Sequence, residues 1–215
     1  MTDTDIIEKL RKRLKQPLPG RSAQEKMIGR VVTMPLTIPA NARPSAVLCL
    51  LYPVDGQLQV LLMKRREDNT PHSGQVSFPG GSYEASDHDL QATALREAFE
   101  EVGIVTTDVD ILGELTSLYI PVSNFKVQPF IGYTPHRPVF NLSHAEVAHT
   151  LEVPLSELLK PELKTIAKVV SPAFPDVSRS VNAYLLPDGT VIWGATAMII
   201  SELEAAVMES AVLGI

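Results

Sequence analysis

Residues 80–104 read GGSYEASDHDLQATALREAFEEVGI, and this stretch decides both the fold and the chemistry of the chain. Apolar residues recur at helical spacing over 90–102, which predicts a helix. Glu97, Glu100 and Glu101 then occupy positions i, i+3 and i+4, so their carboxylates share one helix face. Like charges at this spacing repel by about 0.2–0.5 kcal/mol per pair. The acidic stripe therefore indicates either a bound cation or the solvated face of an ordinary amphipathic helix.

The residues around this helix favour the cation. Gly80 and Gly81 precede the helix and allow the backbone to approach another group closely. Glu84 and Asp87 add two acids in the intervening loop, and Gly103 is well placed to cap the helix C-terminus. Clustered carboxylates suit hard cations such as Mg²⁺, which prefer oxygen ligands and substrate phosphates.

The block resembles the Nudix box, whose pattern is Gly-x5-Glu-x7-Arg-Glu-U-x-Glu-Glu-x-Gly-U, where U is a bulky aliphatic residue. The matching residues, in chain order, are Gly81, Asp87, Arg96, Glu97, Glu100, Glu101, Gly103 and Ile104. The chain departs from the pattern in three ways: Asp87 replaces a Glu, eight residues rather than seven precede Arg96, and Ala98 is small for a U position. The Arg-Glu-x-x-Glu-Glu-x-Gly half is intact.

This resemblance implies an α/β fold, namely an α/β/α sandwich with a mixed sheet. It also implies Mg²⁺ or Mn²⁺, and hydrolysis of a nucleoside diphosphate linked to another moiety. Glu97 and Glu101 would be the main metal ligands, with Glu100 alongside and the Gly81 carbonyl assisting. Arg96 would orient a glutamate rather than contact the substrate.

The longer box, with Asp at its first acidic position, is similar to the coenzyme A pyrophosphatase branch of the family. Further stretches agree with that branch, and together the similarities span about residues 46–200; these stretches are 61–65, 73–81, 121–130 and 192–197. The branch implies coenzyme A or its derivatives as substrate, giving 3′,5′-ADP and 4′-phosphopantetheine. The substrate-binding residues implied are Lys64, Arg65, Gly80 and Phe125.

Two residues differ from the usual form of the branch's upstream motif. Thr70 stands where that motif has an Arg, and Arg66 stands where it has a Ser. If the usual Arg pairs with a phosphate of coenzyme A, then Lys64, Arg65 or Arg66 has to make that contact here.

Hydrolysis also needs a general base, within hydrogen-bond reach of the attacking water. Residues 142–147 resemble the loop-to-strand junction that supplies this base in the coenzyme A branch, which makes Glu146 the candidate. Glu101 and Glu100 are the alternatives, and an exposed acid at a strand edge is the other interpretation of Glu146.

Two other functions remain open at this point. One is a Nudix pyrophosphatase that acts on ADP-ribose, NADH or a similar dinucleotide. The other is a nucleotide-binding module with the same fold and no turnover. The three glutamates of the box favour an enzyme, because a binding module does not need them.

The chain has 215 residues, of which 45% are hydrophobic and 20% charged, as in a typical globular protein. Nineteen Lys and Arg against 25 Asp and Glu leave a formal net charge of −6. Binding to nucleic acid depends on neutralising phosphates, so we expect no nucleic-acid partner. A small phosphorylated substrate would need a local cation to overcome this negative background.

We expect a cytoplasmic protein without a membrane segment. No stretch reaches the roughly 18 consecutive apolar residues of a membrane span. The N-terminus lacks the apolar core of a secretory signal. The single cysteine, Cys49, lies in an apolar run typical of a buried thiol. A homodimer and a monomer both fit the sequence.

The N-terminal segment, residues 1–44, is expected to pack on the remaining domain as a helix followed by an arm. The spacing of apolar residues predicts a helix over 3–15, capped by Asp3 or Thr4. Five prolines over 17–44 predict an extended arm rather than helices.

The domain over 45–215 shows strand patterns interrupted by a few helical ones, which predicts helices covering a mixed sheet. The strands expected are 46–52 with 57–64 as a hairpin, 75–78, 111–119, 126–133, 146–152, and 183–186 with 190–193 as a second hairpin. Besides the acidic helix, we expect helices over 155–159 and 195–208.

Overall fold

A computed structural model describes residues 2–28, 37–68, 72–171 and 174–212. Its main sheet has eight strands: β1 Arg43–Val54, β2 Gln57–Arg65, β3 Val76–Ser77, β4 Gly80–Ser82, β5 Asp110–Glu114, β6 Leu118–Ile120, β7 Phe125–Tyr133 and β8 Val147–Pro154. The central order is β3-β2-β1-β7-β5, with β8 beside β2, β4 beside β1 and β6 beside β7. The strands β1 and β7 run parallel, whereas β2 and β4 run antiparallel to β1. The expected mixed sheet is confirmed.

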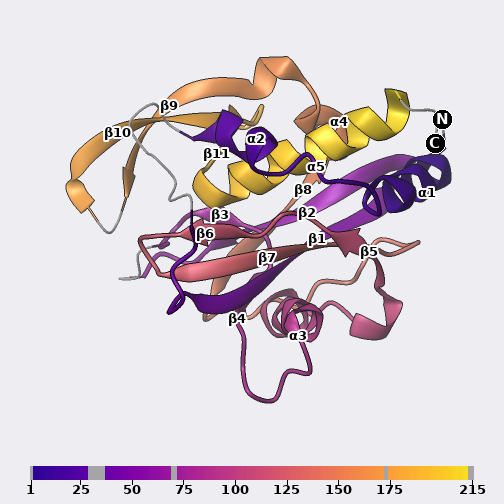
Figure 1. The fold of residues 1–215 in the computed structure, drawn as a ribbon, viewed down its shortest axis with the longest axis horizontal. Coiled ribbons are helices and arrows are strands. Elements are labelled where there is room, and N and C mark those ends of the chain that lie inside the picture. Colours follow the sequence, from indigo (N-terminus) through magenta and orange to yellow (C-terminus); the bar gives the residue numbers. More distant parts are fainter. Residues whose placement is uncertain (1, 29–36, 69–71, 172–173, 213–215) are drawn as a thin grey trace.

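Helices cover both faces of this sheet. Figure 1 shows α3, Leu90–Val102, on one side, with α1, Asp3–Arg13, and α5, Gly194–Val212, on the other. The short α2, Arg21–Gln24, lies on the same side as α5. Three further short elements lie along the chain: η2 Thr106–Asp108, α4 Leu155–Leu158 and η3 Pro161–Leu163. The α/β/α sandwich is therefore as expected.

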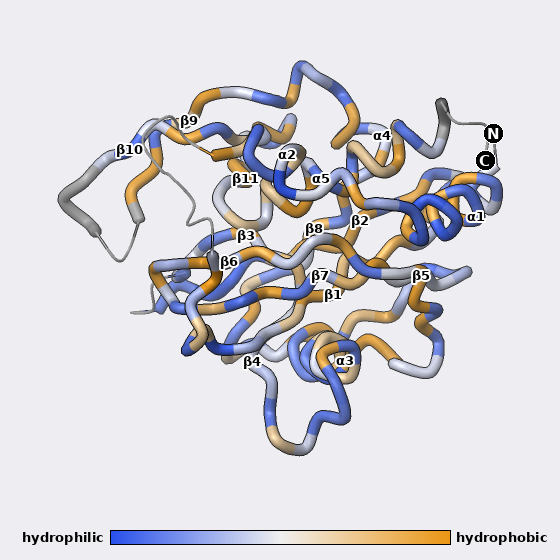
Figure 2. The backbone as a smooth tube through the Cα atoms, viewed as in Figure 1, coloured by the Kyte–Doolittle hydropathy of each residue, from blue (hydrophilic) through white to orange (hydrophobic). Residues whose placement is uncertain are grey.

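The alternation of side chains along β1 divides the core between the two helix layers. Leu48 and Leu50 pack toward α3, whereas Cys49 and Leu51 pack toward α5, and all four are fully buried. A strand buried on both faces has a continuous hydrophobic sequence, which explains the apolar run at this point. Figure 2 shows hydrophobic residues along the middle strands and a mostly hydrophilic α1. Burial raises the pKa of the Cys49 thiol, in keeping with the inert thiol expected.

A second sheet lies beside the first and was only partly predicted. It consists of β9, Lys164–Ser171, β10, Phe174–Leu185, and β11, Val191–Trp193, all antiparallel. The sequence predicted the hairpin of β10 and β11 but not β9. Lys164 and Lys168 interrupt the hydrophobic pattern of β9, so its sequence lacks the alternation of a half-buried strand.

The N-terminal segment differs from expectation at two points. Thr2, rather than Asp3 or Thr4, caps α1: its hydroxyl accepts the Asp5 amide, and the Asp5 carboxylate accepts the Thr2 amide, as in a capping box. The arm is not extended throughout, because α2 and the 3₁₀ turn η1, Glu25–Met27, lie within it.

Helical turns form there because the interval between Pro19 and Pro35 contains no proline. The part of the arm at 29–36 lies outside the described residues.

The strand predicted over 111–119 is two strands, β5 and β6. The pairing of β5 with β7 shifts register between Ile111 and Gly113. The amide of Thr116 then donates to the Glu202 carboxylate of α5, at 3.1 Å, instead of to a neighbouring strand. A side chain from the helix layer thus ends the ladder.

No helix within the described residues is long and apolar enough to cross a membrane.

Glu202 is fully buried and holds three segments together. Its carboxylate accepts the Gly20 amide at 3.0 Å and the Gln24 side-chain amide at 2.8 Å, in addition to the Thr116 amide. It therefore attaches the N-terminal segment and the β5–β6 junction to α5.

Glu202→Gln should reduce the free energy of unfolding by about 2 kcal/mol, because the new NH2 group replaces one of the two accepting oxygens and cannot accept from the buried donors. For a chain of this size the melting temperature should fall by about 4–8 °C. Calorimetry measures this shift, with Glu162→Gln, an exposed acid of η3, as matched control. Equal melting temperatures for both variants would contradict the anchoring role.

Candidate active site

The acidic helix has the bounds that the sequence predicted. The side chain of Asp89 caps α3 by accepting the Ala92 amide at 2.8 Å. Gly103 ends the helix with φ +77°, a left-handed conformation that favours glycine. A β-carbon on Gly103 would also lie 2.8 Å from Asn141, so glycine lets the loop after β7 approach α3 closely.

Glu101 is the buried centre of the acid group, with 2% of its surface exposed. Its Oε2 accepts the Gly80 amide at 2.8 Å, and its Oε1 lies 3.4 Å from Arg65 Nη1. Burial raises the pKa of Glu101 to about 8, although the Gly80 and Arg65 contacts oppose this rise. The negative charges of Glu97 and Glu146 add to it. Three carboxylates are therefore close enough to interact in this part of the structure.

Glu97 lies over the glycine pair. A β-carbon on Gly81 would be 2.5 Å from the Glu97 carboxyl carbon, so any other residue here would displace the Glu97 carboxylate from its present position. Its Oε1 accepts from Arg96 Nη1 at 3.0 Å. Burial raises the pKa of Glu97, with the charges of Glu100 and Glu146 contributing and Arg96 opposing. The glycine of the motif thus makes room for the glutamate 16 residues later.

Arg96 contacts four acceptor groups and positions the acids around it. Its Nε and Nη2 donate to the two carboxylate oxygens of Asp87 at 2.8 and 3.0 Å, and Nη2 also donates to the Ser82 carbonyl at 2.9 Å. Its Nη1 reaches Glu97 and, at 2.9 Å, Glu100. The Glu100 side chain is half-exposed, so it lies at the rim of the group.

Asp87 is held inside the protein rather than presented to a ligand. Besides Arg96, it accepts the Thr93 hydroxyl at 2.8 Å and the Glu84 amide at 3.0 Å. The Arg96 guanidinium holds the pKa of the Asp87 carboxyl well below its usual range. The first acid of the motif is therefore a partner for Arg96, and the oxygens nearest the glycine pair belong to Glu97 and Glu101.

The loop before β8 is fastened to the C-terminal end of α3. The Asn141 amide donates to the Val102 carbonyl at 3.0 Å, and the Ser143 amide donates to the Glu101 carbonyl at 2.9 Å. These bonds bring Glu146, at the end of the loop, near Glu97 and Glu101, whose pKa values its charge raises.

Arg66, the residue directly after β2, holds the same loop through hydrogen bonds, a role that the sequence did not reveal. Its amide donates to the Glu146 carbonyl at 2.8 Å, and its Nη1 donates to the His144 carbonyl at 2.7 Å. The one signal in the sequence was the unusual Arg at this position. Thr70, the other departure from the usual motif, lies outside the described residues.

Comparisons with known proteins agree with this geometry. A family model described as the NUDIX domain matches residues 42–174, which is more than half of the chain. The chain belongs to the Nudix family. The matched residues contain the main sheet, the box helix α3 and the glycine pair beneath Glu97.

Relatives and a solved structure are consistent with this membership. An uncharacterized Nudix hydrolase, NudL, of Photorhabdus laumondii is 36% identical over 79% of this chain and 87% of that protein. NudL of an Enterobacter species is 42% identical over 56% of this chain, which spans 62% of that relative's length. A MutT/nudix family protein of Enterococcus faecalis shares the fold, with a TM-score of 0.51 at 17% identity over 81% of this chain and 65% of that one.

Two of the implied substrate residues lie away from the acids of the Nudix box. Lys64 follows Met63 in β2 and points to the α5 side of the sheet, because successive side chains alternate and Met63 packs toward α3. Phe125 begins β7 and also packs on the α5 side, with the Arg43 guanidinium 4.4 Å from its ring centre. Their substrate contacts stay predictions. Arg65 and Gly80, by contrast, touch Glu101 directly.

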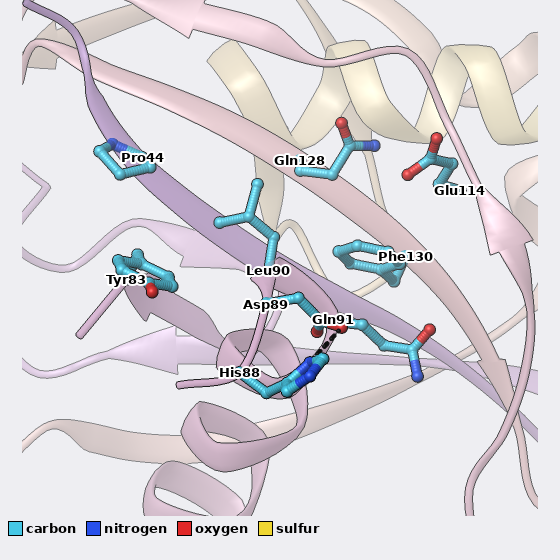
Figure 3. A pocket seen from close by; sticks show the side chains of 9 residues that line it. All are labelled: Pro44, Tyr83, His88, Asp89, Leu90, Gln91, Glu114, Gln128 and Phe130. Atoms are coloured by element: carbon cyan, nitrogen blue, oxygen red, sulfur yellow. Dashed lines mark hydrogen bonds and ion pairs between the residues drawn. The ribbon is translucent and has the colours of Figure 1, made fainter. Parts of the chain in front are cut away.

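A surface cavity beside the box helix does not include the box acids. It has a volume of about 600 Å³ and lies at the N-terminal end of α3 (Figure 3). Tyr83, Leu90 and Phe130 form its apolar walls, and the His88–Asp89 pair lies at its edge. Because Glu97 and Glu101 are absent from its lining, this cavity is separate from the acid group.

The acid group fits a divalent cation by its donor chemistry. Within the part of the chain that the structure describes, no three acidic, His or Cys side chains form a ready-made metal cage. The carboxylates of Glu97 and Glu101 nevertheless adjoin the Gly80–Gly81 backbone, and burial together with the charges of neighbouring glutamates raises the pKa of both. A hard cation would offset these negative charges, and it prefers oxygen ligands of this kind.

Asp87→Asn should lower the free energy of unfolding by about 2 kcal/mol at pH 7, because it removes the charge from a buried ion pair. The folded-state pKa of Asp87 is lowered, so its stabilisation is present above the unfolded pKa and is lost as the pH falls through the folded value. The difference between variant and wild type should therefore be constant above about pH 5 and shrink below about pH 4.

Urea unfolding at pH 7, 5 and 3 measures this difference. Glu84→Gln, an exposed acid of the same loop, is the matched control. A difference that stays the same at pH 3, or an equal loss in the control, would show that the ion pair does not stabilise the box.

Proposed function

We propose that this protein hydrolyses the diphosphate bond of coenzyme A or its derivatives, giving 3′,5′-ADP and 4′-phosphopantetheine. The reaction class is hydrolysis of a nucleoside diphosphate linked to another moiety, and Mg²⁺ or Mn²⁺ is its cofactor. One observation carries the proposal: buried Glu101, bonded to Gly80 and Arg65, interacts with Glu97 and Glu146 on the α3 side of the sheet.

Glu97 and Glu101 would hold the cation, with the Gly81 carbonyl assisting and Glu100 alongside at the rim. When bound, a divalent cation offsets the negative charge that develops on a diphosphate during attack by water. Arg96 keeps Glu97 and Glu100 oriented through its contacts with both, and Asp87 fixes Arg96 in turn. Arg65 lies beside Glu101 and presents a positive charge to the same space.

Glu146 is the proposed general base. It is exposed at the end of a loop that Arg66 and Ser143 hold, and its charge acts on both Glu97 and Glu101. Such a carboxylate can take the proton of an attacking water without serving as a buried ligand. Glu101 is a poorer base for this step, because a carboxylate whose charge is neutralised by a bound cation and by Arg65 has less tendency to take a proton.

The choice of coenzyme A rests on the resemblance of several segments to that branch. Residues 61–65 and 73–81 lead into the box, 121–130 include the turn before β7 and its first half, and 192–197 include the junction of β11 and α5. The first two segments pair with each other through β2 and β3. Arg65 and Gly80, which belong to these two segments, contact Glu101 on the α3 side of the sheet.

A substrate panel tests the function. The protein, with Mg²⁺ or Mn²⁺, is incubated with coenzyme A, an acyl-coenzyme A, ADP-ribose, NADH and a diadenosine polyphosphate, and the products are separated by chromatography. We expect 3′,5′-ADP from coenzyme A. Fast turnover of ADP-ribose with inert coenzyme A would reject the branch, and no turnover at all would favour a binding module.

Glu97→Gln and Glu101→Gln should each lower kcat for coenzyme A by about 100-fold, because each replaces a charged metal ligand by a neutral side chain of similar volume. Glu162→Gln, which lies on η3, is the control and should match wild type. Circular dichroism verifies that the variants fold. Turnover close to wild type in both variants would mean that the acids form only a solvated face.

Glu146→Gln should lower kcat by about 10²- to 10⁴-fold with little change in KM, as removal of a general base does. If Arg66 acts by positioning Glu146, Arg66→Met should lower kcat by about tenfold and should have no further effect in the double variant. Arg137→Met, which removes an arginine bonded to Glu152 elsewhere, is the matched control. Additive losses would mean that Arg66 acts independently of Glu146, and a loss below threefold for Glu146→Gln would return the base to Glu101 or Glu100.

A further inference from the structure

A second cavity, of about 520 Å³, lies between the two sheets, where β2 and β3 end. This volume is within the usual range for small-molecule sites. Its polar and aromatic lining includes Lys64, Gln75, Lys168, Asp188, Thr190 and Trp193. Neither the acid group nor the proposed chemistry explains why these residues face a common space.

The cavity lies across the sheet from the acid group, one residue away along β2. Arg65 points toward α3 and contacts Glu101, whereas the preceding Lys64 points to the α5 side and lines the cavity. The strand ends at Arg65, so its last two residues place one cation on each face of the sheet. A substrate with phosphates at two separated points can meet both cations at this end of β2.

The second sheet supplies the opposite wall, and its position is fixed. Lys168 comes from β9, and Trp193 ends β11 directly before α5. The hydroxyl of Thr196, in the first turn of α5, donates to the Val76 carbonyl of β3 at 2.9 Å. That bond attaches the Trp193 end of the second sheet to the first sheet.

The charge of the cavity suits an anion, in contrast to the chain as a whole. Lys64 and Lys168 line it, while the formal net charge of the chain is −6. His149 of β8 lies directly opposite Lys64 of β2, so the two side chains point to the same face of the sheet. Asp188 is the one acid in the lining, and its carboxylate is turned back to accept the Thr190 amide at 2.8 Å.

Three cations of the upstream segment could bind a phosphate, and the structure separates them. Arg65 is beside Glu101, and Arg66 donates to the His144 carbonyl. Among the side-chain bonds of the described residues, none involves Lys64, which faces the cavity. Trp193 is half-buried at the wall, and the flat face of an indole is suited to stacking on a nucleobase.

We propose that this cavity binds the adenosine 3′,5′-bisphosphate half of the substrate, with Lys64 and Lys168 on its 3′-phosphate and Trp193 against its base. The proposal rests on the function proposed above and specifies which half of coenzyme A lies here. Two ammonium groups and an aromatic wall match a phosphorylated nucleoside better than the uncharged pantetheine arm. Lys168 is then the residue that distinguishes substrates with a 3′-phosphate from those without one.

A direct binding experiment uses Trp193, because it is the single tryptophan of the chain. Its fluorescence should change when 3′,5′-ADP is added without any metal, and 5′-AMP should require about tenfold higher concentration. Lys168→Met should weaken binding of 3′,5′-ADP by about tenfold and leave that of 5′-AMP unchanged. No fluorescence change with 3′,5′-ADP at millimolar concentration would overturn the proposal.

Lys15→Met is the matched control, since Lys15 is also exposed. Lys15 lies two residues after Arg13, and the Arg13 guanidinium donates to Glu209 near the C-terminal end of α5. Trp193 directly precedes the other end of this 19-residue helix, about 28 Å away. This variant should bind both nucleotides like wild type, and a loss of binding equal to that of Lys168→Met would contradict a local role of Lys168.

Kinetics separate this inference from the proposed function. Lys168→Met should raise KM for coenzyme A about tenfold and leave KM for dephospho-coenzyme A, which lacks only the 3′-phosphate, unchanged. If coenzyme A is hydrolysed and both KM values stay at wild type, the cavity assignment fails while the function stands. If no coenzyme A is hydrolysed but 3′,5′-ADP still changes the fluorescence of wild type and not of Lys168→Met, the cavity assignment stands while the function fails.

Discussion

The arrangement of the site depends on one buried carboxylate, that of Glu101. Its side chain contacts Gly80 at the start of β4 and Arg65 at the end of β2, and its backbone carbonyl accepts the Ser143 amide. A single residue of α3 thus joins two strands and the loop that carries Glu146. An unpaired buried charge is costly, so the Gly80 and Arg65 contacts also lower the free energy of keeping a carboxylate in this position. The contacts that stabilise the Glu101 carboxylate are therefore also the contacts that fix the arrangement of the acid group.

The local features of this site could be predicted from the sequence, and their long-range contacts could not. The bounds of α3 and its glycine cap follow from helical spacing and from the residue types at its ends. The motif implied that Arg96 orients a glutamate, and Arg96 donates to Glu97, whereas the role of the Gly81 carbonyl stays a prediction. Arg66 was noticed only as a departure from the usual residue, because its acceptors lie on a loop about 80 residues away in the chain.

The same distinction explains the errors in the fold. Thr116 interrupts a predicted strand because its amide donates to Glu202, a residue of the last helix that no local pattern connects to it. The strand β9 was missed because Lys168 breaks its hydrophobic alternation. In both cases a tertiary contact or a solvent-facing requirement overrides the local preference, as is common for strands. Lys168, which breaks the alternation, is also a residue that lines the cavity between the sheets.

Alternation along the end of β2 connects these observations. Arg65 and Lys64 are adjacent, yet pleating directs them to opposite faces, one toward the acids of α3 and the other toward the cavity. The strand end therefore offers positive charge on both sides of a sheet that belongs to an acidic protein. A substrate with phosphates at both its centre and one end needs cations at two separated points. A single strand end meets that need without a basic surface, which would also attract nucleic acids. On the proposed function, this is how an acidic chain would bind a substrate that carries several phosphates.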